Sequence, residues 1–464
     1  MTIKHWANPI FIGLLILLSL PIKIPALQQW IESIFLVSLP IKLSLYTLFL
    51  TPVAVLCLIW NRRRAKGIWR QLRWPLTIIL FLFCWMWLGS ITSDYLELSL
   101  KHSGRNSIFL LTFVTFLFAL DSESLKNSSR VFSGIYIILM GLTFLDHYGQ
   151  VSIVGIIENL GMKIDLFHSG VGLSETDWDS FRDIKDDFIF MYPTSFFEHR
   201  NPYAVVSAGM FFWGIYNLKH SLFFSSLVSI TAFWSLVIAG SRNGLFTLLF
   251  IFLLLLILTY RHSRNIFVFT LISTILLGII FSTIDSETIN RTRYGLNQLT
   301  SVRSYKDLEK MDLRFTMFRI SLEVGLKSTS IFGSGTKTSG HKMFDNSKDF
   351  ASNFCSSCFL PETRKYWAER YNSHNALLNI WIEMGWVGLF AVLIFLWLWF
   401  RPALLGPPLL MMPMMAVCVG QIFDYFVWEI FFMAFQSFFF AYFASSMNFL
   451  EGNSISQSSD NSDY

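Results

Sequence analysis

Charge is scarce in this chain. Only 14% of its 464 residues are Asp, Glu, Lys or Arg, whereas 53% are hydrophobic and 17% are aromatic. A water-soluble protein of that composition would expose too much apolar surface, but a set of membrane spans would not. The net charge is only +5 and there is no basic tail, which argues against a nucleic-acid partner.

Cysteine is also scarce, with five in the chain. Cys57, Cys84 and Cys418 lie in apolar stretches and are interpreted as small core residues. Cys355 and Cys358 lie close together in a polar loop, but no second pair completes a four-cysteine zinc site. These two cysteines form a local disulfide if their loop faces an oxidising compartment, or have no structural role.

Familiar catalytic signatures are missing. The chain contains no His-Glu-x-x-His and no Gly-x-Ser-x-Gly sequence. Gly335 to Gly340 has the glycine spacing of a phosphate-binding P-loop, but His341 stands where that loop needs Lys followed by Ser or Thr. We therefore interpret Gly333-Ser334-Gly335 as a turn that closes a helix.

Long apolar runs, in contrast, are abundant. The N-terminal run after Lys4 lacks the small-residue cleavage site of a signal peptide, so we predict an uncleaved first helix. The whole pattern predicts an all-α polytopic membrane protein with about 12 transmembrane helices and a large, partly helical periplasmic loop before the tenth. The predicted spans are about 9–26, 41–60, 75–92, 107–120, 131–148, 202–218, 221–239, 244–260, 265–283, 376–400, 407–423 and 426–446.

The distribution of positive charge orients these spans. The link at 61–74 is cytoplasmic by the positive-inside rule, because it holds Arg62, Arg63, Arg64, Lys66, Arg70 and Arg73. Alternation from there makes the other short basic links and both termini cytoplasmic. The two long loops then face outward, with net charges of −5 over 149–200 and +4 over 284–373. A cationic outer domain suits an anionic lipid-linked substrate, and a merely solvated loop is the alternative.

Six regions follow from this topology. They are transmembrane helices 1–5 (1–148), an acidic periplasmic loop (149–200), transmembrane helices 6–9 (201–283), a large cationic periplasmic loop (284–373), transmembrane helices 10–12 (374–447) and a cytoplasmic tail (448–464) whose composition predicts disorder.

His374 occupies a position suited to catalysis on a lipid-linked substrate. It follows about 90 residues of polar loop and immediately precedes the long apolar run Ala376–Phe400, so it lies at the boundary between water and membrane. The simpler interpretation is that Ser373 or Asn375 caps the helix and His374 is an interfacial side chain.

The hairpin around Arg242 is a second candidate. Gly240-Ser241-Arg242-Asn243-Gly244 joins two apolar runs so tightly that Arg242 must lie at the outer membrane face. An arginine at that depth is costly unless it reaches the headgroups or meets an anion. The neighbouring backbone N–H groups, with Ser241 and Asn243, could help to hold a phosphate.

The segment 312–323 has helical periodicity. Phe315, Phe318 and Leu322 form an apolar stripe, which predicts an amphipathic helix on or near the membrane. Arg319 has Glu323 four residues later as an ion-pair partner, whereas Arg314 has no acid at that spacing.

Together these stretches resemble the O-antigen ligase and O-antigen polymerase superfamily, over about 190–400. Its marks are a Ser-Arg hairpin, an Arg-x-x-x-aromatic helix leading to Gly-x-Gly, His-Asn followed by Glu-x-Gly, and Asn-Pro-Asn-x-x-Ala. In this chain they read Ser241-Arg242-Asn243-Gly244, Arg314-Phe-Thr-Met-Phe318 with Gly333-Ser-Gly335, His374-Asn375 with Glu383-Met-Gly385, and Asn201-Pro202-Tyr203-Ala204, with Tyr203 replacing the second Asn.

The resemblance implies a glycosyltransferase of the bacterial inner membrane whose active site faces the periplasm and needs no metal or nucleotide. The donor would be a glycan on undecaprenyl diphosphate, and the acceptor would be the lipid A core for a ligase or another lipid-linked glycan for a polymerase. Arg242 and Arg314 would bind the diphosphate, and His374 would deprotonate or position the acceptor hydroxyl. Ser241, Asn243, Arg319, Asn375 and Asn201 complete the expected substrate-binding set.

Three other functions compete with the ligase. A polymerase is close, because two sizeable outer loops suit it equally. A multi-span transporter of a small anion or glycan should place ionisable residues inside the membrane, and only Glu383, Asp424 and Glu429 are candidates. A structural scaffold comes last. Glu383 lies about 13 Å deeper than His374 on the same helix and on its opposite face, so we predict for it a buried structural hydrogen bond.

Overall fold

The computed structural model describes most of the apolar part of the chain. The residues described are 4–20, 22–23, 62–120, 124–148, 151–164, 195–197, 200–260, 313–328, 331–346, 373–401, 407–422 and 430–460, with isolated positions at 52, 55, 56, 59 and 268. Several predictions therefore concern residues outside this set: the spans 41–60 and 265–283, the pair Cys355 and Cys358, and most of both long loops.

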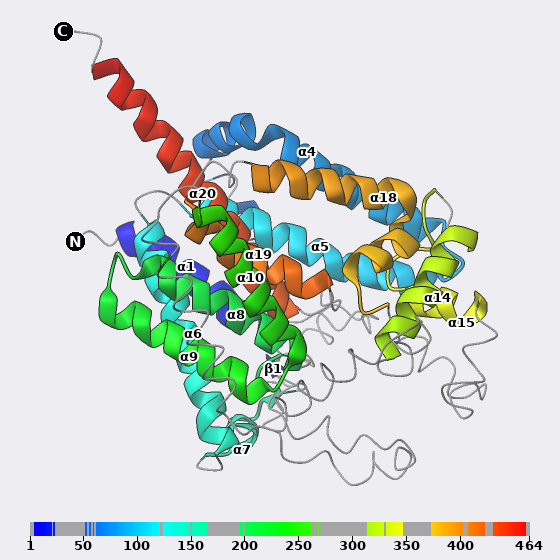
Figure 1. Ribbon diagram of the computed structural model, residues 1–464, viewed down its shortest axis with the longest axis horizontal. Coiled ribbons are helices and arrows are strands. Elements are labelled where there is room, and N and C mark those ends of the chain that lie inside the picture. Colours follow the sequence, from blue (N-terminus) through cyan, green and yellow to red (C-terminus); the bar gives the residue numbers. More distant parts are fainter. Residues whose placement is uncertain are drawn as a thin grey trace.

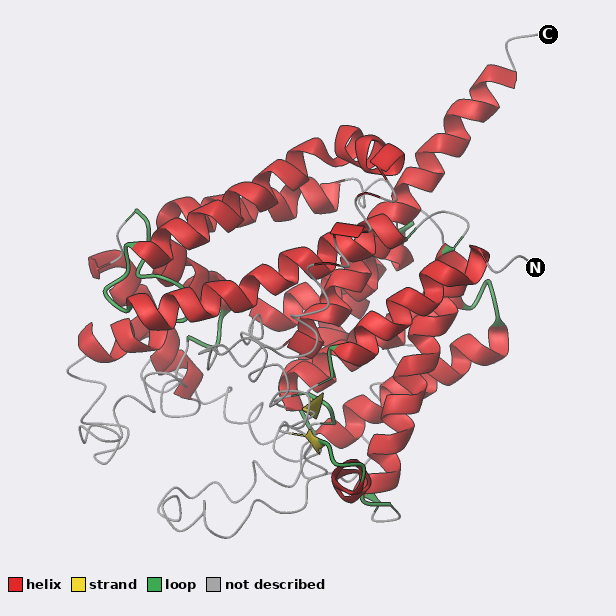
Figure 2. Ribbon diagram, turned by 180° about the vertical axis from the view of Figure 1, so that it is seen from behind, coloured by secondary structure: helices red, strands yellow, loops and turns green. Residues whose placement is uncertain are grey.

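Almost every described element is a helix (Figures 1 and 2). One pair of two-residue antiparallel strands, β1 (Ile22–Lys23) and β2 (Lys163–Ile164), is the exception. The helices are α1 (Lys4–Leu18), α4 (Arg62–Ile91), α5 (Leu96–Ala119), α6 (Leu125–His147), α7 (Ile153–Asn159), α8 (Arg200–Asn217), α9 (Leu222–Ala239), α10 (Arg242–Tyr260), α14 (Leu313–Ser328), α15 (Ser339–Asn346), α18 (Ala376–Phe400), α19 (Pro408–Ile422) and α20 (Ile430–Asp460).

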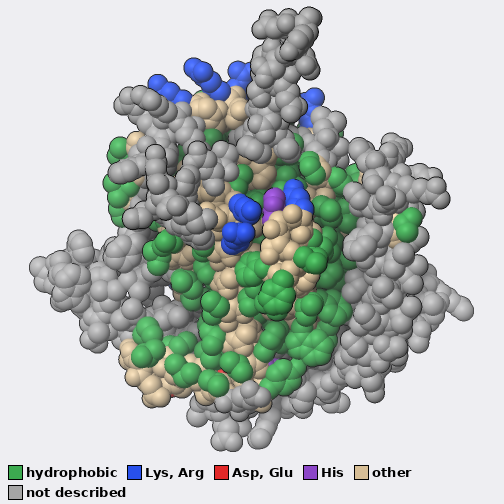
Figure 3. Space-filling view, turned by 90° about the vertical axis from the view of Figure 1, so that its left-hand side faces the viewer, with side chains coloured by type: hydrophobic (Ala, Val, Ile, Leu, Met, Phe, Trp, Pro, Cys, Tyr) green, Lys and Arg blue, Asp and Glu red, His purple; other side chains and the backbone are tan. Residues whose placement is uncertain are grey.

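The helical architecture is that of a polytopic membrane protein. Four described helices are long and apolar enough to cross a bilayer, namely Lys66–Ile91, Leu125–His147, Leu222–Ala239 and Ala376–Phe400. Large apolar side chains point outward from these helices, as with Phe223 at 82% exposure, and hydrophobic side chains cover much of the face in Figure 3. Such contiguous apolar surface is costly in water and ordinary against lipid.

Of three helices compared with the sequence predictions, one agrees and two differ. The predicted span 376–400 is α18, residue for residue. The predicted span 107–120 is too short, because α5 begins at Leu96, and Ser99, His102 and Ser103 of its polar first half are buried. The tail was predicted to be disordered from 448, whereas α20 continues to Asp460 and extends away from the bundle (Figure 1). Adding residues to an existing helix needs no new nucleation step. A prediction of disorder from composition does not take this advantage into account.

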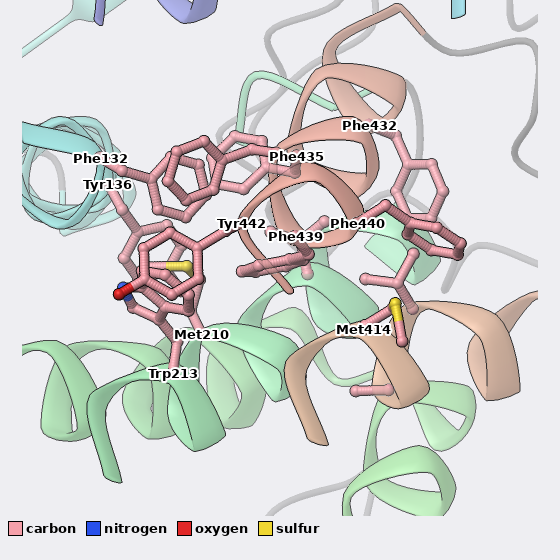
Figure 4. Close-up of a cluster of buried hydrophobic side chains, with 14 of the residues drawn as sticks. Phe132, Tyr136, Met210, Trp213, Met414, Phe432, Phe435, Phe439, Phe440 and Tyr442 are labelled. Atoms are coloured by element: carbon pink, nitrogen blue, oxygen red, sulfur yellow. The ribbon is translucent and has the colours of Figure 1, made fainter. Parts of the chain in front are cut away.

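An aromatic core joins α6, α8, α19 and α20 (Figure 4). The ring of Phe132 stacks on Phe438 with centroids 3.8 Å apart, and Trp213 meets Tyr442 edge to face at 4.5 Å. The indole of Trp213 in this core is paired, since Trp213 Nε1 donates to Ser133 Oγ at 2.9 Å. Such interlocking rings favour one packing arrangement, because helix association in lipid depends on close packing rather than on the hydrophobic effect.

A second unit is built on α4, α5 and α18. α4 and α18 lie side by side, with α5 against α4, and α14 and α15 cover one end of α18 (Figures 1 and 2). Met317, Ile320 and Val324 of α14 are buried beside Met343 of α15 and Ile382 of α18. The sequence missed this face of α14. The predicted stripe of Phe315, Phe318 and Leu322 points elsewhere and is half-buried to exposed, so α14 has two apolar sides.

Candidate functional site

His374 stands immediately before α18 in a strained backbone conformation. Its φ of +48° lies in the left-handed region, which non-glycine residues seldom adopt. Asn375 is the N-cap, with Oδ1 accepting the Leu378 N–H at 3.0 Å. Ser373 Oγ accepts the Asn375 N–H at 3.2 Å, and the Ser373 N–H donates to Asn379 Oδ1 at 3.2 Å. This network holds the half-buried His374 at the start of the helix and confirms that Asn375 caps it.

α18 is broken nine residues after its start. Gly385 has φ 69° and ψ −172°, a combination essentially restricted to glycine. The break frees three consecutive carbonyls, which accept hydrogen bonds from outside the helix. The N–H groups of Ser334 and Gly335 donate to the carbonyls of Ile382 (2.9 Å) and Glu383 (3.0 Å), and Trp85 Nε1 donates to that of Met384 (2.9 Å).

We call residues 333–338 and 382–385 the clasp. The predicted turn at Gly333-Ser334-Gly335 is a turn, but it is also inserted against the broken α18. A Cβ atom at Gly333 would overlap the carbonyl of Glu383 and the nitrogen of Gly385, so the Gly-x-Gly turn can pack on the Glu-x-Gly backbone only because Gly333 has no side chain. A broken helix at membrane depth is tolerated when its freed backbone groups are satisfied by protein in this way.

The side chain of Glu383 anchors the opposite side of the clasp. It is only 3% exposed. Hydrogen bonding from the N–H groups of Lys337 and Ser339 and from the Ser339 hydroxyl favours its charged form, while its Oε1 has no hydrogen-bond partner among the described residues. Ser339 begins α15, so the carboxyl lies at a helix N-terminus, where a negative group is favoured. Lys337 has φ +62°, a second strained non-glycine residue near the site. The predicted structural role of Glu383 agrees with these contacts.

A buried hydroxyl network fixes the clasp to α4 and α5. Thr336 Oγ1 lies 2.8 Å from Ser103 Oγ and 3.2 Å from Ser90 Oγ, and Ser99 Oγ donates to Ser90 Oγ at 2.7 Å. At the surface, Lys342 Nζ lies 2.8 Å from Asp94 Oδ2 and holds the pKa of that carboxyl below its usual range. The sequence analysis missed this network, because serines spaced along apolar helices are common and carry no motif.

The helix that carries Arg314 and Arg319 packs on α18. Gly325 lies so close to Trp381 that an added Cβ would be 2.6 Å from its ring. Arg319 pairs with Glu323 at 2.9 Å, as the sequence predicted, and Lys327 approaches the same carboxylate at 3.8 Å. Arg314 is in the first turn of α14, and its side chain lies outside the described residues. α14 therefore brings the backbone of Arg314 into the same unit as His374.

The Arg242 hairpin belongs to a different group of helices. Ser241 caps α10, since its Oγ accepts the Gly244 N–H at 3.3 Å, and the same Oγ donates to Asn201 Oδ1 at 2.6 Å. Asn243 Nδ2 donates to the carbonyl of Gly420 at 3.1 Å. The structure thus brings Asn201 and Ser241 together, and it ties the hairpin to α8 and α19. Arg242 is the first residue of α10, and its side chain lies outside the described residues.

Comparison with known proteins finds a family match for one segment of the chain. Residues 227–393 match a family model described as O-antigen ligase. The matched segment contains the hairpin, α14, the clasp and His374, and it leaves Asn201 outside. No curated protein matches the chain. The resemblance to the O-antigen ligase and polymerase superfamily predicted from the sequence is therefore confirmed.

Proposed function

We propose, on the basis of this O-antigen ligase segment, that the protein is a glycosyltransferase of the bacterial inner membrane. It transfers a glycan from undecaprenyl diphosphate to a hydroxyl of the lipid A core at the periplasmic face, without a metal. The observation that supports the proposal most strongly is that three of the motifs, those of Gly333–Gly335, His374 and Arg314, lie together around α18. The Gly333–Gly335 turn is hydrogen-bonded to the helix that starts just after His374, and the helix of Arg314 packs on that same helix.

The proposed reaction is a displacement at the anomeric carbon of the donor sugar. The acceptor oxygen forms a bond to that carbon while the bond from carbon to the diphosphate oxygen breaks. Undecaprenyl diphosphate leaves with the bonding electron pair, and the proton of the acceptor hydroxyl passes to His374 and then to solvent. The strained backbone of His374 supports this role. Backbone strain persists where the surrounding structure enforces a particular geometry, and such residues cluster at active sites.

The leaving group requires positive charge. Arg242 and Arg314 would stabilise the negative charge that develops on the diphosphate, since a guanidinium can contact phosphate oxygens with two parallel hydrogen bonds. Ser241, Asn243 and Asn375 already make hydrogen bonds within the protein. Their proposed contribution to substrate binding is therefore to fix the backbone next to the two arginines and His374.

Transporter function has less support. Among its candidate ionisable residues, Asp424 and Glu429 lie outside the described residues. Glu383 is enclosed by the clasp, so its carboxyl is engaged in holding α15 and α18 together. A polymerase would use the same chemistry with a lipid-linked glycan as acceptor. Lipopolysaccharide from a deletion strain separates the two enzymes: core without O-antigen indicates a ligase, core with a single repeat indicates a polymerase, and an unchanged ladder contradicts both.

The direct test is His374→Ala in a transfer assay on purified protein. We expect transfer to fall by about 100-fold or more, because a base or orienting group contributes that much to rate. His147→Ala is the matched control, because this histidine lies in the last turn of α6, outside the unit that carries His374, and we expect it to retain transfer. Near wild-type transfer by His374→Ala, with normal membrane insertion, would make His374 an interfacial side chain only.

A further inference from the structure

A small, partly open cleft lies between α6, α8 and α9. It is at the end of these helices remote from the Arg242 hairpin. Asn201 and Asn217 mark the two ends of α8, and sixteen residues of helix separate them by about 24 Å. Of these two residues, Asn217 lines the cleft and Asn201 does not. The cleft therefore cannot be part of the proposed transfer site.

Basic side chains surround the mouth of the cleft. Lys126 and Arg130 of α6 line it together with His220 of the α8–α9 link, and no lining residue is acidic. Burial lowers the pKa of the His220 imidazole, and the positive charges of Lys219, Lys126 and Arg130 lower it further. These groups are thus close enough to repel one another. Figure 3 looks onto the side of the molecule that is at the left in Figure 1, where Lys and Arg side chains gather near a histidine.

The floor of the cleft is polar and buried. Ser129, Ser133, Asn217 and Ser225 all line it and are all less than 10% exposed. Ser129 Oγ donates to Asn217 Oδ1 at 3.0 Å, and Asn217 Nδ2 donates to the carbonyl of Trp213 at 2.8 Å. Polar side chains buried among apolar helices are costly unless they are hydrogen-bonded. In this cleft they extend inward from the basic residues at its mouth.

One wall of the cleft leads to apolar surface. Phe224 and Val228 of α9 line it. Beyond them, the outward side of the same helix is strongly exposed, with Leu222 at 73%, Phe223 at 82% and Ile230 at 66%. A soluble anion would use only the cations and the polar floor, whereas a lipid would use the apolar surface as well.

We propose that this cleft binds the phosphate headgroup of an anionic phospholipid, whose acyl chains lie along the exposed side of α9. Basic pockets between transmembrane helices bind such headgroups, and each nearby Lys or Arg adds electrostatic attraction. On the predicted topology the lipid belongs to the cytoplasmic leaflet, on the opposite side of the membrane from the proposed transfer reaction.

Native mass spectrometry of the purified, delipidated full-length protein tests the proposal by titration with phosphatidylglycerol. The variant is Lys126→Gln combined with Arg130→Gln. The control is Lys66→Gln combined with Arg70→Gln, which removes the same charge from exposed positions on α4 that do not line the cleft. We expect the cleft variant to bind phosphatidylglycerol on the order of tenfold more weakly and the control to bind like the wild type.

Four results would overturn the proposal. The first is equal binding by the cleft variant and the wild type, and the second is equal weakening in the α4 control. The third is phosphatidylcholine binding as tightly as phosphatidylglycerol, which removes the role of the anionic headgroup. The fourth is inorganic phosphate binding as tightly as the lipid, which makes the cleft a free-anion site. Because the readout is lipid binding, it is independent of whether the protein transfers glycan.

Discussion

The two packed regions of this protein are built by different means. The aromatic core of α6, α8, α19 and α20 relies on ring contacts such as that between Phe132 and Phe438. The clasp relies on glycines, strained backbone and hydrogen bonds to freed carbonyls. The core can repack around a similar side chain at modest cost, whereas the clasp loses its geometry if a single Cβ is added. The motifs around His374, Gly333 and Gly385 lie in the second kind of region, where a reacting group can be held rigidly, whereas the Arg242 hairpin is tied to α8 and α19 of the first.

Gly333→Ala should give the largest effect. The new Cβ would overlap the carbonyl of Glu383, and φ at this position is +80°, so the clasp must open. We expect loss of transfer and a lower thermal midpoint in detergent. Gly134→Ala is the matched control, because nothing lies within 4 Å of its added Cβ in α6, and it should be neutral or slightly stabilising. Wild-type transfer by Gly333→Ala would show that the clasp does not position the site.

Phe132→Leu should have an intermediate effect of a different kind. The side chain is fully buried and contacts Phe438, Phe435 and Trp213. Losing these ring contacts should cost about 1 kcal/mol or more and lower the thermal midpoint, while the transfer rate per folded molecule stays near wild type. The comparison between the two regions fails if transfer falls as steeply here as in Gly333→Ala.

Asp94→Asn should have the smallest effect. The hydrogen bond and charge of Lys342 lower the pKa of Asp94 in the folded protein, so its stabilisation is present above the unfolded pKa and disappears as pH falls through the folded value. The substitution should therefore lower the thermal midpoint slightly at pH 7 and leave it unchanged in strong acid. A pH-independent difference would mean that the ion pair does not link α15 to the α4–α5 turn.

The sequence predicts the local features of the unit that carries the motifs, but not the tertiary contacts that hold it together. The capping residue Asn375, the start and end of α18 and the Arg319–Glu323 pair are local features, and the structure confirms them. The break at Gly385 was not predicted. A single glycine in an apolar run does not indicate that another segment of the chain will donate hydrogen bonds to the carbonyls just before it. The second apolar side of α14 was missed for a related reason. Met317, Ile320 and Val324 are as regularly spaced as the predicted stripe, and only tertiary contacts distinguish the two.

The central claim is that Arg314 of α14, rather than Arg319, binds the donor diphosphate together with Arg242. Transfer by purified Arg314→Lys and Arg319→Lys tests it most directly. Lysine keeps the charge but loses the forked contact with phosphate, whereas the exposed Arg319–Glu323 pair contributes only about 0.3–0.5 kcal/mol and tolerates the change. The account predicts severe impairment of Arg314→Lys and nearly normal transfer by Arg319→Lys. Normal transfer by both variants, or failure of Arg319→Lys alone, would contradict it.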